Sequence, residues 1–173
     1  MSTSTPKSEA PGALAIVLFG VYVVLLMGII LFKFPFQYDL GDSGRELNLI
    51  PFAGSLADHR GFGVGDIVAN VLVFVPLGVY ASMFKPRWSF GRRLLTVVAT
   101  SLAFEVIQYV FAIGRSDITD VLGNTAGGLI GIGLYALAAA TLRNRTNRVL
   151  TIVALVVTVL VVAFFTYLRL HSR

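Results

Sequence analysis

The feature that most constrains this chain is a series of apolar stretches, each about as long as a membrane is thick. A transmembrane helix takes about 20 consecutive, mostly apolar residues. Stretches of this kind lie at residues 12–32, 65–84, 93–113, 118–142 and 148–168. The mean hydropathy of +0.82 and the charged fraction of 13% are also unusual for a soluble domain. The sequence therefore predicts an all-α integral membrane protein, a bundle of about five transmembrane helices.

The length of the chain leaves little of it outside the membrane. Five spans use roughly 100 residues of the 173 in the chain. We predict a single membrane domain over residues 1–173, with a disordered tail at 1–11 and a carboxyl-terminal anchor span at 148–168. The chain has no cysteine, which excludes disulfides, thiolate metal ligands and cysteine nucleophiles. Any chemistry must therefore lie within the membrane or at its edge.

The positive charges predict how the bundle is oriented. Two of the predicted loops carry basic residues and no acidic ones. These residues are Lys85, Arg87, Arg92 and Arg93 in one loop and Arg143, Arg145 and Arg148 in the other. Loops of this kind lie in the cytoplasm. The amino terminus is therefore expected in the cytoplasm and the long segment 33–64 outside. The basic residues are assigned to membrane orientation, and nucleic acid is not an expected partner.

Ionisable and amide side chains interrupt three of the predicted spans. Within each span they are three or four residues apart, so they share one face of a helix. They are Asp66 and Asn70 in the second span, Glu105 and Gln108 in the third, and Asp117, Asp120 and Asn124 in the fourth. Burying a charged group in a membrane costs free energy unless the group is paired or hydrated. Each of these residues is therefore a candidate for a functional site.

The expected depths of these side chains converge. With a rise of about 1.5 Å per residue, the three amides and Asp120 lie roughly 5 to 10 Å below the external surface, and Glu105 lies nearer the midplane. At that depth Glu105 must be protonated or paired, and Arg115 or a bound cation is the expected partner. We predict a polar pocket open to the outside, with Asn48 from the external segment above it.

A purely structural interpretation of the same residues stays open. Asn and Gln within spans often only hydrogen-bond neighbouring helices. Gly123, Gly127 and Gly131 form a ladder of small residues that favours close helix packing. Asp117 and Asp120, in the first turn of their helix, can cap its exposed amides.

Four short motifs follow one another between residue 48 and about residue 135. They are Asn48 to Phe52; Asn70 with Phe74, Pro76 and Gly78; Glu105 with Gln108; and Gly114, Arg115, Asp117, Asp120, Asn124 and Gly127. In this order and spacing they resemble the VanZ-like family of small bacterial membrane proteins. The resemblance implies a multi-pass protein of the bacterial cytoplasmic (inner) membrane and a link to resistance against teicoplanin, a glycopeptide antibiotic with a lipid tail. No established reaction comes with the family.

Three functions are compatible with these observations. The first is a resistance module that binds a lipid-linked or lipidated envelope molecule in the pocket and requires no cofactor. Its expected ligand-binding residues are Asn48, Asp66, Asn70, Glu105, Gln108, Arg115, Asp117, Asp120 and Asn124.

The second function is a membrane enzyme that modifies an envelope lipid. Glu105 and Asp120 would then be the catalytic acid–base pair, or Asp66, Asp117 and Asp120 would hold a divalent cation. The third function is transport of a lipid or small molecule, for which five spans are few, so it would need an oligomer.

Overall fold

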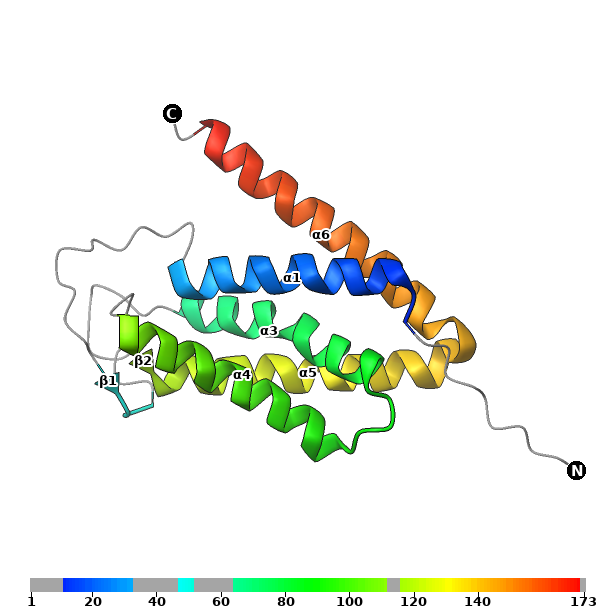
Figure 1. Ribbon diagram of the computed structural model, residues 1–173, viewed down its shortest axis with the longest axis horizontal. Helices are drawn as coiled ribbons and strands as arrows, with labels where there is room; N and C mark the ends of the chain where they lie inside the picture. Colours follow the sequence, from blue (N-terminus) through cyan, green and yellow to red (C-terminus); the bar gives the residue numbers. More distant parts are fainter. Residues whose placement is uncertain (1–10, 33–46, 52–63, 112–115, 172–173) are drawn as a thin grey trace, which may run out of the picture.

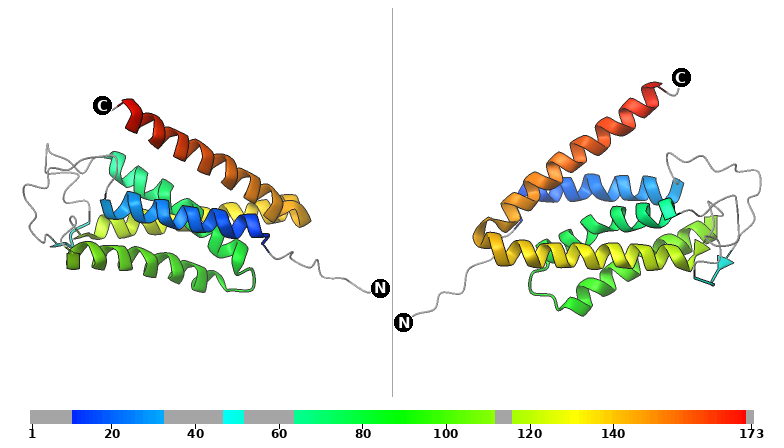
Figure 2. Two further views of the ribbon diagram at one scale, coloured as in Figure 1. Left: turned by 45° about the horizontal axis from the view of Figure 1, so that its top comes forward. Right: turned by 180° about the vertical axis from the view of Figure 1, so that it is seen from behind.

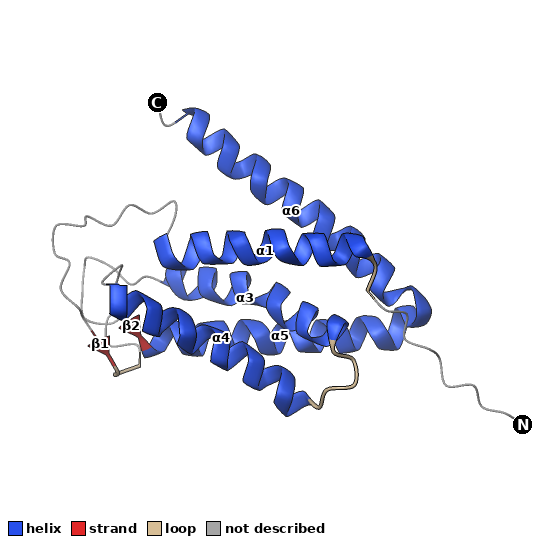
Figure 3. Ribbon diagram, viewed as in Figure 1, coloured by secondary structure: helices blue, strands red, loops and turns tan. Residues whose placement is uncertain are grey.

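A computed structural model of the protein describes residues 11–32, 47–51, 64–111 and 116–171. Most of these residues lie in helices (Figure 3), which confirms the all-α fold class. In chain order the elements are α1 (Ala13–Phe32), β1 (Leu47–Asn48), α3 (Val64–Phe84), α4 (Phe90–Phe111), β2 (Ser116–Asp117), α5 (Ile118–Leu142), the 3-10 helix η2 (Arg143–Arg145) and α6 (Thr146–His171).

Four helical segments in the described part of the chain are long and apolar enough to cross a membrane. Three of them are α1, α3 and α4, and the fourth is the continuous stretch Ile118–His171, which contains α5, η2 and α6. This stretch reverses direction near Arg143, which has a φ of 50°, and α6 then folds back from the end of α5 (Figure 1). The protein is therefore a membrane protein, while the number of five spans stays a prediction.

The two basic loops lie at the same end of the bundle. Figure 1 shows the α3–α4 connection and the α5–α6 turn at one end, with the strands β1 and β2 at the opposite end. The chain turns at both places because its apolar stretches stop at clusters of basic residues and, after α3, at Pro86. Both basic loops thus face one side of the membrane, and we expect that side to be the cytoplasm.

Helices α3 and α5 approach each other so closely that only glycine fits between them. A Cβ atom placed on Gly127 would collide with the carbonyl oxygen of Val71, and one on Gly131 would collide with that of Val75. A Cβ on Gly78 of α3 would in turn strike the carbonyl oxygen of Gly128. The predicted packing role of the glycine ladder is confirmed, because the missing side chains let the two backbones touch.

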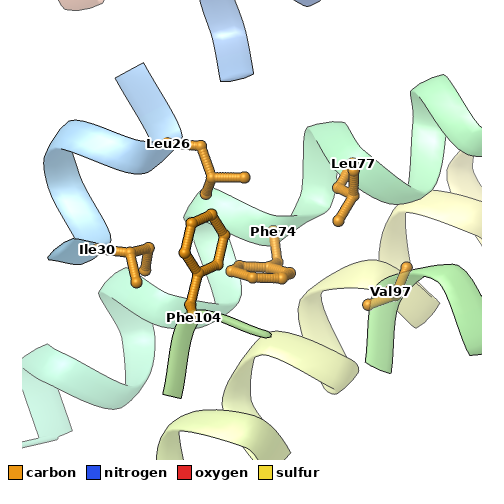
Figure 4. Packing of buried hydrophobic residues seen from close by; sticks show 6 residues of the cluster. All are labelled: Leu26, Ile30, Phe74, Leu77, Val97 and Phe104. Atoms are coloured by element: carbon orange, nitrogen blue, oxygen red, sulfur yellow. The ribbon is translucent and has the colours of Figure 1, made fainter. Parts of the chain in front are cut away.

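An apolar cluster joins α1, α3 and α4 beside this contact. Figure 4 shows its six residues, Leu26, Ile30, Phe74, Leu77, Val97 and Phe104. The rings of Phe74 and Phe104 meet edge to face, with centroids 6.4 Å apart. This geometry is favourable for aromatic pairs and holds α4 against α3.

A hydrogen bond from α1 reaches α3 where proline interrupts its ladder. Pro76 has no N–H to donate to the carbonyl of Leu72, one turn earlier. The hydroxyl of Tyr22 donates to the neighbouring carbonyl of Val73 at 2.9 Å. A side chain of α1 thus contacts the α3 backbone beside its interrupted turn.

Candidate functional site

The candidate site begins where two short strands, far apart in the sequence, meet. Strands β1 and β2 pair in parallel, with Asn48 opposite Asp117. Asn48 Nδ2 donates to Asp117 Oδ2 at 2.9 Å, and the backbone N–H of Ile50 donates to Asn48 Oδ1 at 3.1 Å. The amide nitrogen of Asn48 thus joins the segment 47–51 to the residue before α5, while its oxygen holds a turn within the segment.

Asp117 and Glu105 together fasten the start of α5 to α4. Asp117 is the N-cap of α5, and its Oδ1 accepts the backbone N–H of Thr119 at 2.8 Å. The backbone N–H of Asp117 donates to Glu105 Oε2 at 2.9 Å. The hydroxyl of Ser116 donates to the backbone carbonyl of Glu105 at 2.8 Å. The capping role expected for Asp117 is therefore confirmed, and Glu105 bonds to the backbone of the same residue.

These contacts place Glu105 at the level of the first turn of α5. The sequence predicts Glu105 deeper than Asp120, because that prediction lets α5 begin at the membrane surface. In the structure β2 precedes α5 and bonds to α4 at Glu105. Glu105 lies six residues, or about 9 Å, before the end of α4 at Phe111. The start of α5 is therefore about that far inside the bundle.

Asn70 and Asp120 connect α3 to α5. Asn70 Nδ2 donates to Asp120 Oδ1 at 2.6 Å. Both residues therefore lie at one depth, as the spacing along their helices predicts. Asp66 is half-buried one turn before Asn70 on the same helix.

Two further amides connect α4 to its neighbours. Gln108 Nε2 donates to the backbone carbonyl of Ile30 at the end of α1, at 2.9 Å. Asn124 Nδ2 donates to the hydroxyl of Ser101 at 2.9 Å. Ser101 is not among the residues predicted from the sequence, although its position four residues before Glu105 places it on the same face of α4. A small hydroxyl carries a weaker signal in a sequence than a carboxylate does.

We call these hydrogen-bonded residues the polar centre: Asn48, Asn70, Ser101, Glu105, Gln108, Asp117, Asp120 and Asn124. Its members on α4, β2 and α5 are nearly closed to solvent. The exposed fraction is 1% for Gln108 and Asn124, 3% for Asp117, 7% for Asp120 and 8% for Glu105. Within the described residues, Gln108 Oε1 and Asn124 Oδ1 are buried and accept no hydrogen bond. A buried acceptor without a donor costs about 1 to 3 kcal/mol. Both oxygens are therefore suited to accept an N–H or O–H from water or a bound molecule.

The polar centre is equipped to hold groups that donate hydrogen bonds, such as hydroxyls and ammonium ions. The two residues expected as an acid–base pair bond to different elements, Glu105 to the start of α5 and Asp120 to α3. In the described ranges, no three acidic or histidine side chains are grouped so that they could hold a metal ion. Arg115, expected as a partner of Glu105, lies outside the described residues, as does Phe52.

Comparison with known proteins gives two matches. The family model described as VanZ/LLP1 matches residues 19–139. The chain is 34% identical over 159 residues to a protein of Enterococcus faecium named Protein VanZ, and this alignment covers 89% of the chain and 94% of that relative. No solved structure matches. The range matched by the family model includes every residue of the polar centre.

Proposed function

The chain belongs to the VanZ/LLP1 family, and from this premise we propose that it protects a bacterium against teicoplanin and related lipidated glycopeptides as a multi-pass protein of the cytoplasmic membrane. Its polar centre binds a lipid-linked or lipidated envelope molecule from the external side. The proposal rests on the link of the family to teicoplanin resistance and on the buried polar groups at the end of the bundle opposite the basic loops.

One observation carries the binding role. Gln108 Oε1 and Asn124 Oδ1 are buried acceptors without a donor among the described residues. The nitrogen of each amide already bonds to a neighbouring helix, so the oxygens are not needed for fastening, and a buried acceptor without a donor costs about 1 to 3 kcal/mol. The unused acceptors are instead matched to a ligand with amine or hydroxyl groups.

The surroundings of the polar centre also suit a lipid tail. Val106, Tyr109 and Val110 are exposed on α4 at the same level as Glu105 and Gln108. Membrane lipid meets these side chains, so an acyl chain can remain in the bilayer while its polar head enters the centre. This division explains why a protein of this kind would distinguish a lipidated glycopeptide from one without a tail.

The test is the drug susceptibility of a deletion strain that carries wild-type or variant protein at equal membrane levels. We expect wild-type protein to raise the inhibitory concentration of the lipidated glycopeptide and not that of its counterpart without the tail. Asn124→Leu should abolish this protection, because it removes the unused acceptor and fills its space. Ala126→Leu, an exposed position on the same helix, is the matched control and should protect normally.

Glu105→Gln separates binding from catalysis. The variant keeps the shape and the acceptor oxygen but removes the charge and the ability to transfer a proton. Protection that survives this change supports a binding module. If protection is lost while the folded variant still retains the lipidated drug, the enzyme interpretation is favoured instead. Protection by Asn124→Leu equal to the wild type would contradict a role of the polar centre.

A further inference from the structure

A groove of about 570 Å³ runs along α4, and no residue of the polar centre lines it. It extends from Trp88 and Arg92 to Ile107. Arg92 and Ile107 are fifteen residues apart along α4, or about 22 Å, which exceeds half of a hydrocarbon core of about 30 Å. Figures 1 and 2 show the amino-terminal end of α4 diverging from α5. The volume is in the range of small-molecule sites, about 300 to 1,000 Å³.

The walls of the groove are largely apolar, although two threonines line it, because their hydroxyl groups bond within α4. The Thr96 hydroxyl donates to the carbonyl of Arg92 at 3.0 Å, and the Thr100 hydroxyl donates to that of Thr96 at 2.8 Å. Both hydroxyl hydrogens are therefore used within the helix. Ala99 and Ala103, which have only a methyl group, also line the groove. Short side chains with satisfied polar atoms leave an apolar groove suited to an acyl chain.

One end of the groove is basic. Arg92 is exposed there, and Trp88 is half-buried beside it. The Nζ of Lys85 lies 5.6 Å from the centroid of the Trp88 ring, which is within reach of a cation–π interaction. Tryptophan next to basic residues is typical of the level of lipid headgroups. This end of the groove is therefore suited to a negatively charged headgroup.

A second copy of the chain fits the groove less well. Two copies in one membrane have the same orientation, so a two-fold interface along α4 would set each Arg92 near its equivalent. The repulsion of these like charges opposes such a dimer. We propose that the groove binds an anionic phospholipid, with its acyl chain along α4 and its phosphate at Arg92 and Lys85. This site is separate from the polar centre and does not depend on the proposed function.

Trp88 is the single tryptophan of the chain, so its fluorescence reports on the groove. The full chain is reconstituted in phosphatidylcholine vesicles with increasing mole fractions of either phosphatidylglycerol or phosphatidylcholine that carries brominated acyl chains, which quench tryptophan. We expect brominated phosphatidylglycerol to quench Trp88 at several-fold lower mole fraction. Arg92→Gln should reduce this preference about five-fold, the effect of one basic residue near an anionic surface. Arg145→Gln, at the same end of the bundle but outside the groove, should leave it unchanged.

A second pair of variants tests the apolar part of the groove. Ala99→Leu fills the groove at an exposed position and should lower quenching by the anionic lipid, whereas Ala136→Leu, exposed on α5, should not. Equal quenching by the two lipids overturns the proposal. Equal losses with Arg92→Gln and Arg145→Gln also overturn it, because they indicate attraction to the whole basic surface. Protection of Trp88 from quenching by both lipids, together with a dimer in detergent micelles, would assign the groove to a second copy of the chain.

Discussion

Substitution of Gly127 by alanine tests the close contact of α3 and α5 most directly. An added Cβ would overlap the carbonyl oxygen of Val71 and would lie 2.9 Å from its carbonyl carbon and 3.0 Å from its Cα. Ordinary contacts of a Cβ begin near 3.4 Å. Because the obstacle is backbone, no side-chain rotation can relieve it. The two helices must therefore separate.

The loss of folding free energy in Gly127→Ala follows from this separation of α3 and α5. Returning the new methyl group to contact distance moves the helix axes apart by about 1 Å. Overpacking of this kind destabilises a core by about 1 to 3 kcal/mol. The same displacement stretches the bond between Asn70 and Asp120, which is 2.6 Å long in the structure. Alanine offsets part of the loss, since it favours a helix by up to about 1 kcal/mol over glycine.

Gly133→Ala is the matched control on the same helix. A Cβ at Gly133 meets nothing within 4 Å, so this variant should be as stable as the wild type or slightly more stable. Unfolding of both variants in detergent micelles, followed by tryptophan fluorescence and circular dichroism, measures the difference. We expect Gly127→Ala to be less stable than Gly133→Ala by about 1 to 3 kcal/mol. Equal stability of the two would refute the close backbone contact.

Three further predictions concern single contacts of the structure. Asn48→Cys with Asp117→Cys should form a disulfide on mild oxidation in this cysteine-free chain, because paired strands hold their Cα atoms about 5 Å apart; a gel shift detects it, and its absence would contradict the β1–β2 pairing. Tyr22→Phe should cost about 1 kcal/mol in thermal unfolding, since the donor to the Val73 carbonyl is lost; a loss no larger than that of Tyr80→Phe would show that this bond contributes nothing. Arg143→Gly should stabilise the α5–α6 turn by about 1 kcal/mol, because Arg143 has a φ of 50°, whereas Arg145→Gly removes the same charge without that gain; equal stabilities in thermal unfolding would argue against strain at Arg143.

The helices, and the helix faces that carry polar groups, could be predicted from the amino-acid sequence alone. Apolar length and helical spacing are local properties, and α1, α3 and α4 end within a few residues of the predicted spans. Spacing also placed Asn70 and Asp120 at matching depth, and the glycine ladder on the packed face of α5. These inferences succeed because a rise of about 1.5 Å and a turn of 100° per residue hold in any helix.

How the helices are set against one another could not be predicted from the sequence. The relative depth of Glu105 depends on the bonds of β2 to α4, and no periodicity in the chain encodes them. Ser101 of α4 belongs to the polar centre because Asn124 of the neighbouring α5 donates a hydrogen bond to it. The unused acceptors on Gln108 and Asn124 likewise depend on which neighbours each amide meets. Helical geometry is local, whereas the register between helices is set by the packing of the whole bundle.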